Sequence, residues 1–500
     1  MPRLTADDVM ALVALAGCAA LCLAFRYLPM VDVPQHHAMV SIMLHHADPA
    51  WGFAQRYTFD FLGRPYATVY WLGAALGAVM PLGAAMRIVV AVCTVAPLAG
   101  AQLLLVATRR SRVWLLPAVP FAFGSLWHWG FLNFLLGTGM FLGCLALVVR
   151  LAERPSRRGS VVLAVLALLL LFTHFHGLAM LLVSSPALVW AYAGERGRAP
   201  WVRAIAPLVP AGVAAAAFVL LTWAQAEGNW MRANPGAGER VDRFVEFLAW
   251  GLPDGAATIS LGALAVLVVA AVVLGGAWPR PTRVAAALGV TLAAQVAMYF
   301  ALPLNTNTAT YVSARHALLV VLLALPLLPV LAGRARLALR AGGALTAAFG
   351  LVTAGKQLAC FDREARDFAP VLDAMAPAKR VATLIFERAS ACCGERSFPY
   401  LHFGAYYQAA KGGELSRSFA VVWNVPIRYR ADYARYPYRE ELEWMPGRFS
   451  PEDARHFDYV LVRGGAAEPP PQLGLREVTR SGAWAVYEST TAIPAELPGP

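Results

Sequence analysis

Long apolar segments separated by short polar loops constrain this chain more than any other feature of its sequence. The first runs from Val9 to Leu28, and ten more occupy residues 88–107, 113–127, 131–149, 160–173, 178–193, 204–223, 258–277, 284–302, 317–332 and 341–355. About 20 apolar residues in a helix cross roughly 30 Å of hydrocarbon. A helix also satisfies its own backbone hydrogen bonds in lipid. The sequence therefore predicts a polytopic α-helical membrane protein with about eleven transmembrane helices.

The composition agrees with residence in lipid. Of the 500 residues, 59% are hydrophobic and 14% are charged, whereas a soluble domain carries about 25% charged residues. The formal net charge is +12, but most arginines lie in short loops, where they orient helices rather than bind polyanions. This distribution argues against nucleic acid as a partner.

The distribution of arginine predicts how the chain is threaded. Loops 108–112, 150–159, 194–203, 278–283 and 333–340 contain fifteen arginines against two acidic residues. The alternate loops 128–130, 174–177 and 303–316 contain only Arg315. The positive-inside rule places the arginine-rich loops in the cytoplasm. Residues 29–86, 224–257 and all residues after about 356 are then expected outside, and residues 66–83 are expected to form a helix along the outer face.

The chain is expected to have two parts. Residues 1–356 form the transmembrane bundle with its long first outer loop, 29–86, and residues 357–500 form a small extracytoplasmic α/β domain. In this domain the patterns predict helices at Phe368–Met375 and His402–Ala410, and strands at Arg380–Phe386, Tyr459–Arg463 and Ala483–Glu488. The 39 arginines against 3 lysines are typical of a GC-rich bacterial genome, so the expected location is a bacterial inner membrane.

Asp32 is the leading candidate for a functional residue. It follows the first apolar segment, and Pro34 restricts Val33 to an extended conformation, which is expected to end the helix and turn the carboxylate over the bundle. A carboxylate near hydrocarbon is costly without a role. The alternative is an interfacial residue at a helix end that takes part in no chemistry.

Histidines form a second group of candidates. His36 follows Asp32, and His174 and His176 lie in a short loop that is expected on the same side of the membrane. A metal site made of Asp32, His36 and His174 is one interpretation, since imidazole and carboxylate suit several divalent ions. Hydrogen bonding to a substrate and a plain interfacial polar edge are the others.

Three motifs together resemble the C-type glycosyltransferases (GT-C), membrane enzymes that use polyprenyl-phosphate sugars. The first is Asp32 just after the first helix. The second runs from Gly63-Arg64-Pro65-Tyr66 to Arg87, and the third is Tyr311-Val312-Ser313-Ala314-Arg315-His316 before a leucine-rich helix. The layout is also similar, particularly to polyprenyl-phosphate-sugar-dependent aminoarabinose transferases and protein O-mannosyltransferases.

The resemblance implies transfer of a sugar from a polyprenyl-phosphate donor to a lipid, glycan or protein acceptor outside the membrane. Asp32 would be the general base. Arg87 and Arg315 would face the phosphate, although both arginines are also placed to reach lipid headgroups. The other residues expected to bind substrate are His36, Asp60, Arg64, His174, His176 and His316.

Many family members carry two neighbouring acidic residues where this chain has only Asp32, followed by valine and proline. A second carboxylate would come from Asp48 or Asp60, and a divalent metal, Mg²⁺ or Mn²⁺, stays open as a cofactor. Two other functions also stay open. One is a transporter or flippase for lipid or polysaccharide, and the other is a non-catalytic membrane assembly protein.

Overall fold

The computed structural model describes residues 4–64, 66–193, 198–223, 236–249, 251–253, 255–278, 282–306, 310–394, 397–436, 439–464 and 473–493. The chain divides into two compact units. The helical unit comprises Met1–Ala24, Val90–Trp127 and Phe131–Lys356. The sheet unit comprises Phe25–Val89, His128–Gly130 and Gln357–Pro500. The first loop thus groups with the C-terminal residues, whereas the sequence assigned it to the bundle.

The helical unit confirms the prediction of a polytopic helical protein. Seven described segments are helical, long and apolar enough to cross a membrane. They are α1 (Ala6–Ala24), α4 (Leu82–Ala107), α6 (Leu132–Glu153), the segment Val202–Leu221, α13 (Ala256–Val273), α14 (Arg283–Ala301) and the segment Gly333–Ala374. The predicted number of eleven crossings is therefore not confirmed.

The other helices of this unit are α5 (Ser125–Trp129), α7 (Arg157–Thr173), α8 (Phe175–Ala193), α11 (Ala237–Asp242), α12 (Phe244–Ala249) and α15 (Arg315–Ala324). The segment Val202–Leu221 contains the end of α9 (Arg198–Ile205) and most of α10 (Val209–Trp223). α16 (Gly333–Ala365) forms most of the segment Gly333–Ala374 and continues into the sheet unit. The crossing predicted at 113–127 is instead a 3₁₀ helix, Arg112–Phe123, followed by α5. Pro117 and Pro120 lie inside it, and each lacks the N–H that an α-helix needs.

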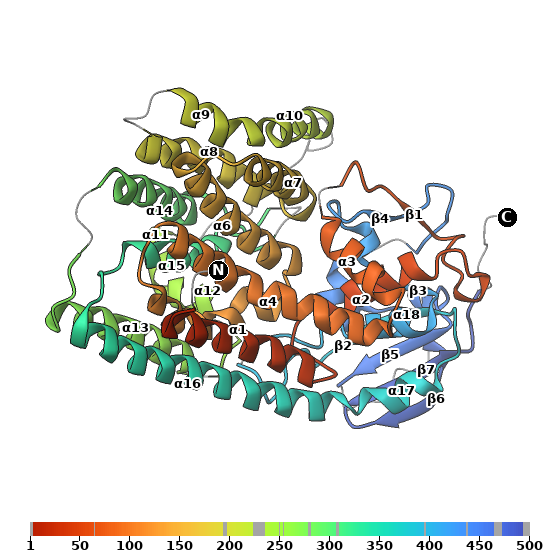
Figure 1. Ribbon diagram of the computed structural model, residues 1–500. Coiled ribbons are helices and arrows are strands. Elements are labelled where there is room, and N and C mark those ends of the chain that lie inside the picture. The colour runs from red at the N-terminus through yellow and green to blue at the C-terminus, as the bar shows by residue number, and fades with distance from the viewer. Residues whose placement is uncertain are drawn as a thin grey trace. The chain divides into compact units, whose positions relative to one another are not determined.

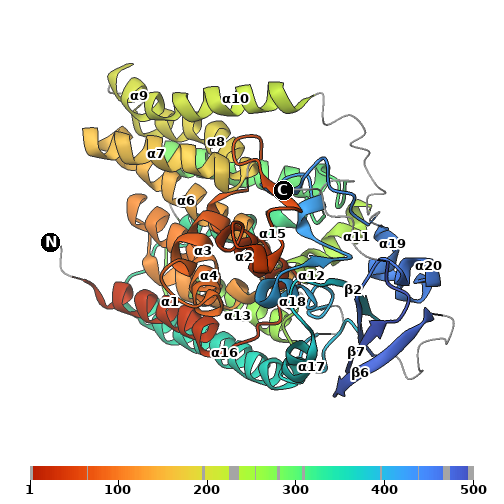
Figure 2. The ribbon, with the colours of Figure 1, turned by 90° about the vertical axis from the view of Figure 1, so that its right-hand side faces the viewer.

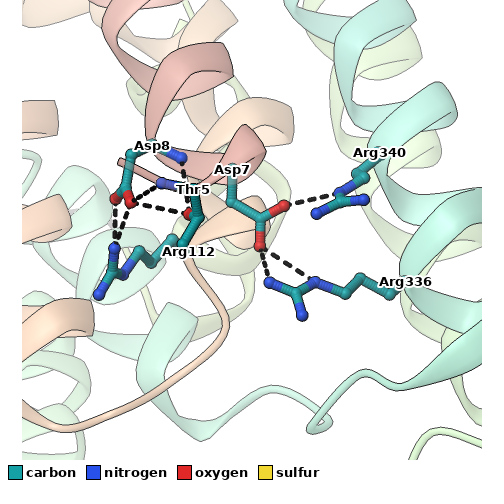
Figure 3. A network of polar contacts seen from close by, with 6 residues as sticks. All are labelled: Thr5, Asp7, Asp8, Arg112, Arg336 and Arg340. Atoms are coloured by element: carbon teal, nitrogen blue, oxygen red, sulfur yellow. Dashed lines mark hydrogen bonds and ion pairs between the residues drawn. The ribbon is translucent and has the colours of Figure 1, made fainter. Parts of the chain in front are cut away.

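The start of α1 is fixed by ion pairs. α1 lies alongside α16 in both views (Figure 1 and Figure 2), where Gly17 faces Leu351. Asp7 accepts hydrogen bonds from Arg336 and Arg340 of α16, and Asp8 accepts from Arg112 (Figure 3). Carboxylates are also favoured at a helix N-terminus. The arginine-rich residues 108–112 and the arginine-rich first turns of α16 (residues 333–340) therefore lie at one end of the helical unit, with the beginning of α1.

The sheet unit is built on a five-stranded sheet with the strand order β3-β2-β5-β7-β6. The strands are β2 (Arg380–Ile385), β3 (Glu414–Leu415), β5 (Tyr459–Arg463), β6 (Leu475–Ser481) and β7 (Trp484–Ser489). β2 is parallel to β3 and β5, and β7 is antiparallel to β5 and β6. The apolar side chains of β2, β5 and β7 are buried in a core with Phe449 and Phe457.

Helices cover this sheet. They are α17 (Phe368–Ala374), which contacts β6 and β7, α18 (Ala405–Lys411), which contacts β3, and α19 (Glu440–Trp444), which contacts β2. A shorter helix, α20 (Pro451–Ala454), precedes β5. The five elements predicted for the C-terminal region are confirmed to within a few residues, as is the small α/β domain (Figure 1).

The first loop contributes three elements to the same unit. α2 (Val33–Leu44) packs against α18 and against α3 (Thr68–Gly77). β1 (Tyr57–Phe59) pairs with β4 (Ile427–Tyr429), so that Tyr57 lies opposite Tyr429. A disulfide joins Cys360 at the end of α16 to Cys392.

One local prediction is wrong. Val33 is not extended; it begins α2, and α1 has already ended at Ala24. Pro34 lies in the first turn of α2, where its missing N–H would have no helical partner and its fixed φ suits the helix. Proline here starts a helix and does not end one.

Candidate functional site

Asp32 is the residue immediately before α2, and its backbone is held by residues 128–130. The amide of Val31 donates to the carbonyl of His128 (2.8 Å), and the amide of Asp32 donates to the carbonyl of Trp129 (3.1 Å). Gly130 has a φ of +81°, and a Cβ there would lie 3.0 Å from the Asp32 nitrogen. Glycine is the residue that tolerates both the dihedral and the close approach.

His402 lies against the Asp32 carboxylate. Its Nδ1 is 3.0 Å from Oδ1 of Asp32, and its Nε2 is 2.6 Å from Oε1 of Glu443. The second oxygen of Glu443, Oε2, is 2.8 Å from Nη1 of Arg417. Ionised carboxylates only accept hydrogen bonds, so both ring nitrogens of His402 must donate. The side chain is therefore an imidazolium between two carboxylates.

Burial and the charged neighbours have opposite effects on the pKa values of His402 and Glu443. The side chain of His402 is 5% exposed and that of Glu443 is 8% exposed. Burial by itself lowers the pKa of His402, but the hydrogen bonds to Asp32 and Glu443 outweigh it and raise that pKa above its usual value. Burial raises the pKa of Glu443, and the hydrogen bond from His402 and the charge of Arg417 outweigh it, so this pKa is lowered. Both shifts favour the charged forms.

Packing within the sheet unit fixes each member of this network. Phe403, next to His402, contacts the rings of Phe368 and Tyr400. Gln35 of α2 donates to the carbonyl of Arg417 and accepts from the amide of Phe419, both at 3.0 Å. Gln35 of α2 therefore fixes the backbone of the segment that carries Arg417.

His36 is oriented by protein groups. Its Nδ1 is 3.0 Å from the hydroxyl of Tyr70 and its Nε2 is 3.2 Å from the carbonyl of Gly130. Because a carbonyl only accepts, Nε2 carries the proton and Nδ1 accepts from Tyr70. Burial lowers the pKa of His36, which favours this neutral form.

The residues around Asp32 do not fit the divalent metal considered from the sequence. Both nitrogens of His36, one of the expected ligands, are already hydrogen-bonded. Within the described ranges, no group of three or more histidine, cysteine, aspartate or glutamate side chains is arranged to hold a metal ion.

Asp60 and Arg64 form a pair of their own in the sheet unit. Asp60 accepts from the amide of Gly63 (2.9 Å) and lies 3.4 Å from Nε of Arg64. The guanidinium of Arg64 stacks over the ring of Trp423, 5.3 Å from its centroid. Pro65, which belongs to the same motif, lies outside the described residues. Arg87 is half-buried in the first turns of α4.

The remaining candidates gather in the helical unit. Arg315, the first residue of α15, donates from Nη1 to Nε2 of His174 (3.2 Å) and from Nη2 to the carbonyl of Thr310 (3.2 Å). Its guanidinium lies over the rings of Phe131 and Phe134. The structure therefore brings Arg315 and His174 together, although they are 141 positions apart.

His176 and His316 extend this cluster. Their ring centroids are 4.8 Å apart, and Nδ1 of His316 donates to Oε1 of Gln295 at 2.8 Å. The Nε2 atoms of both histidines are buried and have no hydrogen-bond partner among the described residues. A small hollow adjoins His176; it is lined by Phe134, Thr138, Phe141, His174, His176, Gly177, Met180 and Leu319.

Sequence reasoning did not identify His402, Glu443 or Arg417. All three lie in a region that was recognised only as an α/β domain, and Arg417 stands between two serines, Ser416 and Ser418. The one available signal was a histidine between two buried apolar residues, Leu401 and Phe403. Nothing in the spacing related it to Asp32.

The chemistry of the Asp32 site follows from its charges. The described residues hydrogen-bond one carboxylate oxygen of Asp32, Oδ1, and the side chain is 14% exposed. Its Oδ2 is therefore able to accept a proton from a bound hydroxyl group. The hydrogen bond from Nδ1 of His402 to Oδ1 holds the carboxylate in place while Oδ2 stays available.

Comparisons with known proteins agree with this architecture. Two crystal structures of ArnT from Cupriavidus metallidurans are similar to the chain, one bound to undecaprenyl phosphate and one in the apo state. Each alignment covers 97% of this chain and 98% of ArnT, with a TM-score of 0.50 and 14% sequence identity. No protein-family model matches the sequence, and no curated protein is similar to it in sequence. This chain therefore has a fold similar to that of ArnT.

Proposed function

We propose that this protein is a membrane glycosyltransferase that moves a sugar from a polyprenyl-phosphate donor to an extracytoplasmic acceptor, with Asp32 as the general base. The observation that carries the proposal is the Asp32 carboxylate, hydrogen-bonded to a protonated His402, in a chain that has the fold of ArnT. One of the ArnT structures is bound to undecaprenyl phosphate.

In the proposed reaction, Oδ2 of Asp32 takes the proton of the acceptor hydroxyl. The acceptor oxygen then forms a bond to the anomeric carbon of the sugar. The bond from that carbon to the phosphate oxygen breaks, and the polyprenyl phosphate leaves with the electron pair. A positioned general base contributes about 10²- to 10⁴-fold in rate.

The leaving phosphate needs positive charge. Arg315 supplies it in this proposal, since a guanidinium pairs with phosphate through two hydrogen bonds. His174, His176 and His316 lie beside Arg315 and are proposed to contact the same group. Arg87, Arg64, Asp60 and His36 are proposed to contact the donor or acceptor through the sheet unit.

The proposed location is the inner membrane of a bacterium, with the sheet unit outside the cytoplasm. The arginine-rich residues 108–112 and 333–340, which are expected on the same side of the membrane, both bind the first turn of α1 at one end of the helical unit. The disulfide between Cys360 and Cys392 supports an oxidising compartment for the sheet unit.

The test uses the purified full-length protein in lipid nanodiscs with undecaprenyl-phosphate sugars and a bacterial lipid extract as acceptor. Release of undecaprenyl phosphate measures donor consumption whichever component of the extract accepts the sugar. Wild-type protein is expected to consume at least one donor, and Asp32→Asn is expected to lose that activity. Asp48→Asn is the matched control, because Asp48 lies in the same loop and its carboxylate caps the short 3₁₀ helix Pro49–Trp51.

Three outcomes would contradict the proposal. Unchanged donor consumption by Asp32→Asn would remove Asp32 as the base. Movement of intact donor across the bilayer, without its consumption, would favour the transporter or flippase. A protein that neither consumes nor moves any donor would fit an assembly protein.

A further inference from the structure

We propose that His402 is a positioning residue for the catalytic base, and that its charge state sets the alkaline limit of sugar transfer. The proposal rests on the proposed function, since it requires Asp32 to be the base. It gives the C-terminal region a part in the reaction through Asp32, because His402 of that region binds this carboxylate of the first loop. Both residues belong to the sheet unit.

The geometry requires two donated hydrogen bonds. Nδ1 of His402 faces Asp32 at 3.0 Å and Nε2 faces Glu443 at 2.6 Å. Only the imidazolium form donates from both nitrogens. A neutral ring donates from one nitrogen and turns a lone pair towards the other carboxylate, which repels it. Loss of one proton therefore breaks one side of the network.

The side that breaks is the one facing Asp32. The Glu443 contact is the shorter of the two, and it is the more deeply buried, with Glu443 8% and Asp32 14% exposed. The shorter and more deeply buried hydrogen bond keeps the remaining proton, so the proton stays on Nε2. Asp32 then loses the hydrogen bond that orients its carboxylate.

Other charged groups around His402 act on this equilibrium. Asp32, at the start of α2, and Glu443, on α19, stabilise the charged ring directly. The charges of Arg417 and Arg388 lower the pKa of Glu443. The charge of His402 lowers the pKa of His36 in α2. The edge of the Phe419 ring packs against the imidazole, with the ring centroids 5.6 Å apart. The two carboxylates are the nearest charges, so they dominate.

Two substitutions separate positioning from folding. In His402→Asn, the side-chain amide places a donor close to the position of Nδ1, so the hydrogen bond to Asp32 is kept but no longer titrates. In His402→Gln, the amide reaches the position of Nε2, so the bond to Glu443 is kept and Asp32 is left without its partner. Arg417 remains paired with Glu443 in both variants.

The experiment measures donor consumption in nanodiscs between about pH 6 and pH 9, a range that brackets the titration of a perturbed histidine. Wild-type activity is expected to fall on the alkaline side. His402→Asn is expected to keep substantial activity with no alkaline fall. His402→Gln is expected to lose about 100-fold in kcat with an unchanged KM for the donor. The matched control is His456→Asn, because His456 lies in the same unit and packs on Tyr436.

A second arm covers the case in which both His402 variants fail to fold. Glu443→Gln leaves His402 in place but removes one of its two carboxylates, so the alkaline fall is expected to move to lower pH. An alkaline fall that is unchanged in Glu443→Gln, or that persists in His402→Asn, would overturn the proposal. If Asp32→Asn is also fully active, the proposed function fails; if Asp32→Asn is inactive, only the role of His402 fails.

Discussion

Nδ1 of His402 lies 3.0 Å from Oδ1 of Asp32, although the two residues are 370 positions apart in the chain. This hydrogen bond is one of several between the first loop and the C-terminal region. Gln35 binds the backbone of Arg417 and Phe419, and Ser41 donates to the carbonyl of Ala409. The first loop is therefore folded against the C-terminal region and is not an independent extension of the bundle.

The first prediction concerns this dependence. A protein truncated after Lys356 should still insert its helices, but its first loop should lose β4, the partner of β1, and α18, the partner of α2. Limited proteolysis in nanodiscs should then cut within residues 29–86, where full-length protein resists. Equal resistance of the two proteins would show that the loop folds alone.

The second prediction compares Asp32 with Asp60, another acidic residue of the first loop that the sequence analysis considered. Asp32→Asn should reduce donor consumption by about 10²- to 10⁴-fold while the melting temperature stays near that of wild type, because the substituted amide still offers an oxygen to His402. Asp60→Asn should have a much smaller effect, since Asp60 pairs with Arg64 at a half-exposed position. A larger loss in Asp60→Asn than in Asp32→Asn would reverse the assignment of the base.

The sequence predicted the helical membrane fold and the C-terminal strands because both depend on local patterns. The apolar segment of α6 and the buried strand Tyr459–Arg463 each reveal their structure by composition and length alone. The same reasoning gave a wrong prediction for residues 113–127. Its composition is that of a membrane helix, but Pro117 and Pro120 make it a 3₁₀ helix.

The site was predictable only in part. Asp32 was found because a carboxylate next to an apolar segment is unusual, and that is a local signal. Its partners, His402 and Glu443, come from positions whose neighbours are ordinary for an α/β domain, and only the tertiary fold relates them to Asp32. The effect of Pro34 was misjudged because a proline between two helices can end the first or begin the second.

The third prediction is a pH dependence of stability. The pKa of His402 is raised in the folded protein. Its charged form therefore contributes fully to the free energy of unfolding below the usual histidine pKa, and this contribution is lost as the pH rises through the raised pKa. The pKa of Glu443 is lowered in the folded protein. Its charged form therefore contributes fully to the free energy of unfolding above the usual glutamate pKa, and this contribution is lost as the pH falls through the lowered pKa. Both contributions are therefore complete between the usual pKa values of glutamate and histidine, so this network should stabilise wild-type protein most at mildly acidic pH.

Glu443→Gln should reduce the free energy of unfolding near neutral pH by about 3 kcal/mol, because it breaks a buried ion pair. Thermal melts across pH measure this loss. Glu477→Gln is the control, since the pair of Glu477 with Arg480 is solvent-exposed and contributes about 0–1 kcal/mol. Equal, small losses in the two variants would contradict a structural contribution of the network.

The fourth prediction concerns membrane orientation. A cysteine at Pro155, in an arginine-rich loop, should resist a membrane-impermeant thiol reagent in intact cells. A cysteine at Val478, on the exposed edge strand β6, should react once the reagent has crossed the outer membrane. The background should carry Cys393→Ser, because Cys393 is the free cysteine that is not fully buried among those described. Labelling at Pro155 from outside would invert the threading.

The last prediction concerns Arg315 and the donor phosphate. Arg315 is held by His174 and Thr310 and lies over two phenylalanine rings, so its guanidinium is fixed in place and not extended freely into the headgroup region. If it binds the donor phosphate, Arg315→Ala removes both the charge and the two parallel hydrogen bonds. The loss of transition-state stabilisation should be about 2–5 kcal/mol, as for a desolvated charge pair.

Arg315→Lys keeps the point charge but loses the planar fork, so its loss should be smaller than that of Arg315→Ala and should appear in the kinetics of donor consumption. Arg283→Ala is the control, because Arg283 begins another helix, α14, and its guanidinium stacks on Trp190. Equal and small effects of both Arg315 substitutions would mean that Arg315 only contacts lipid headgroups. A graded loss, with alanine worse than lysine and the control unchanged, follows only if the guanidinium meets a specific anion whose negative charge develops during transfer.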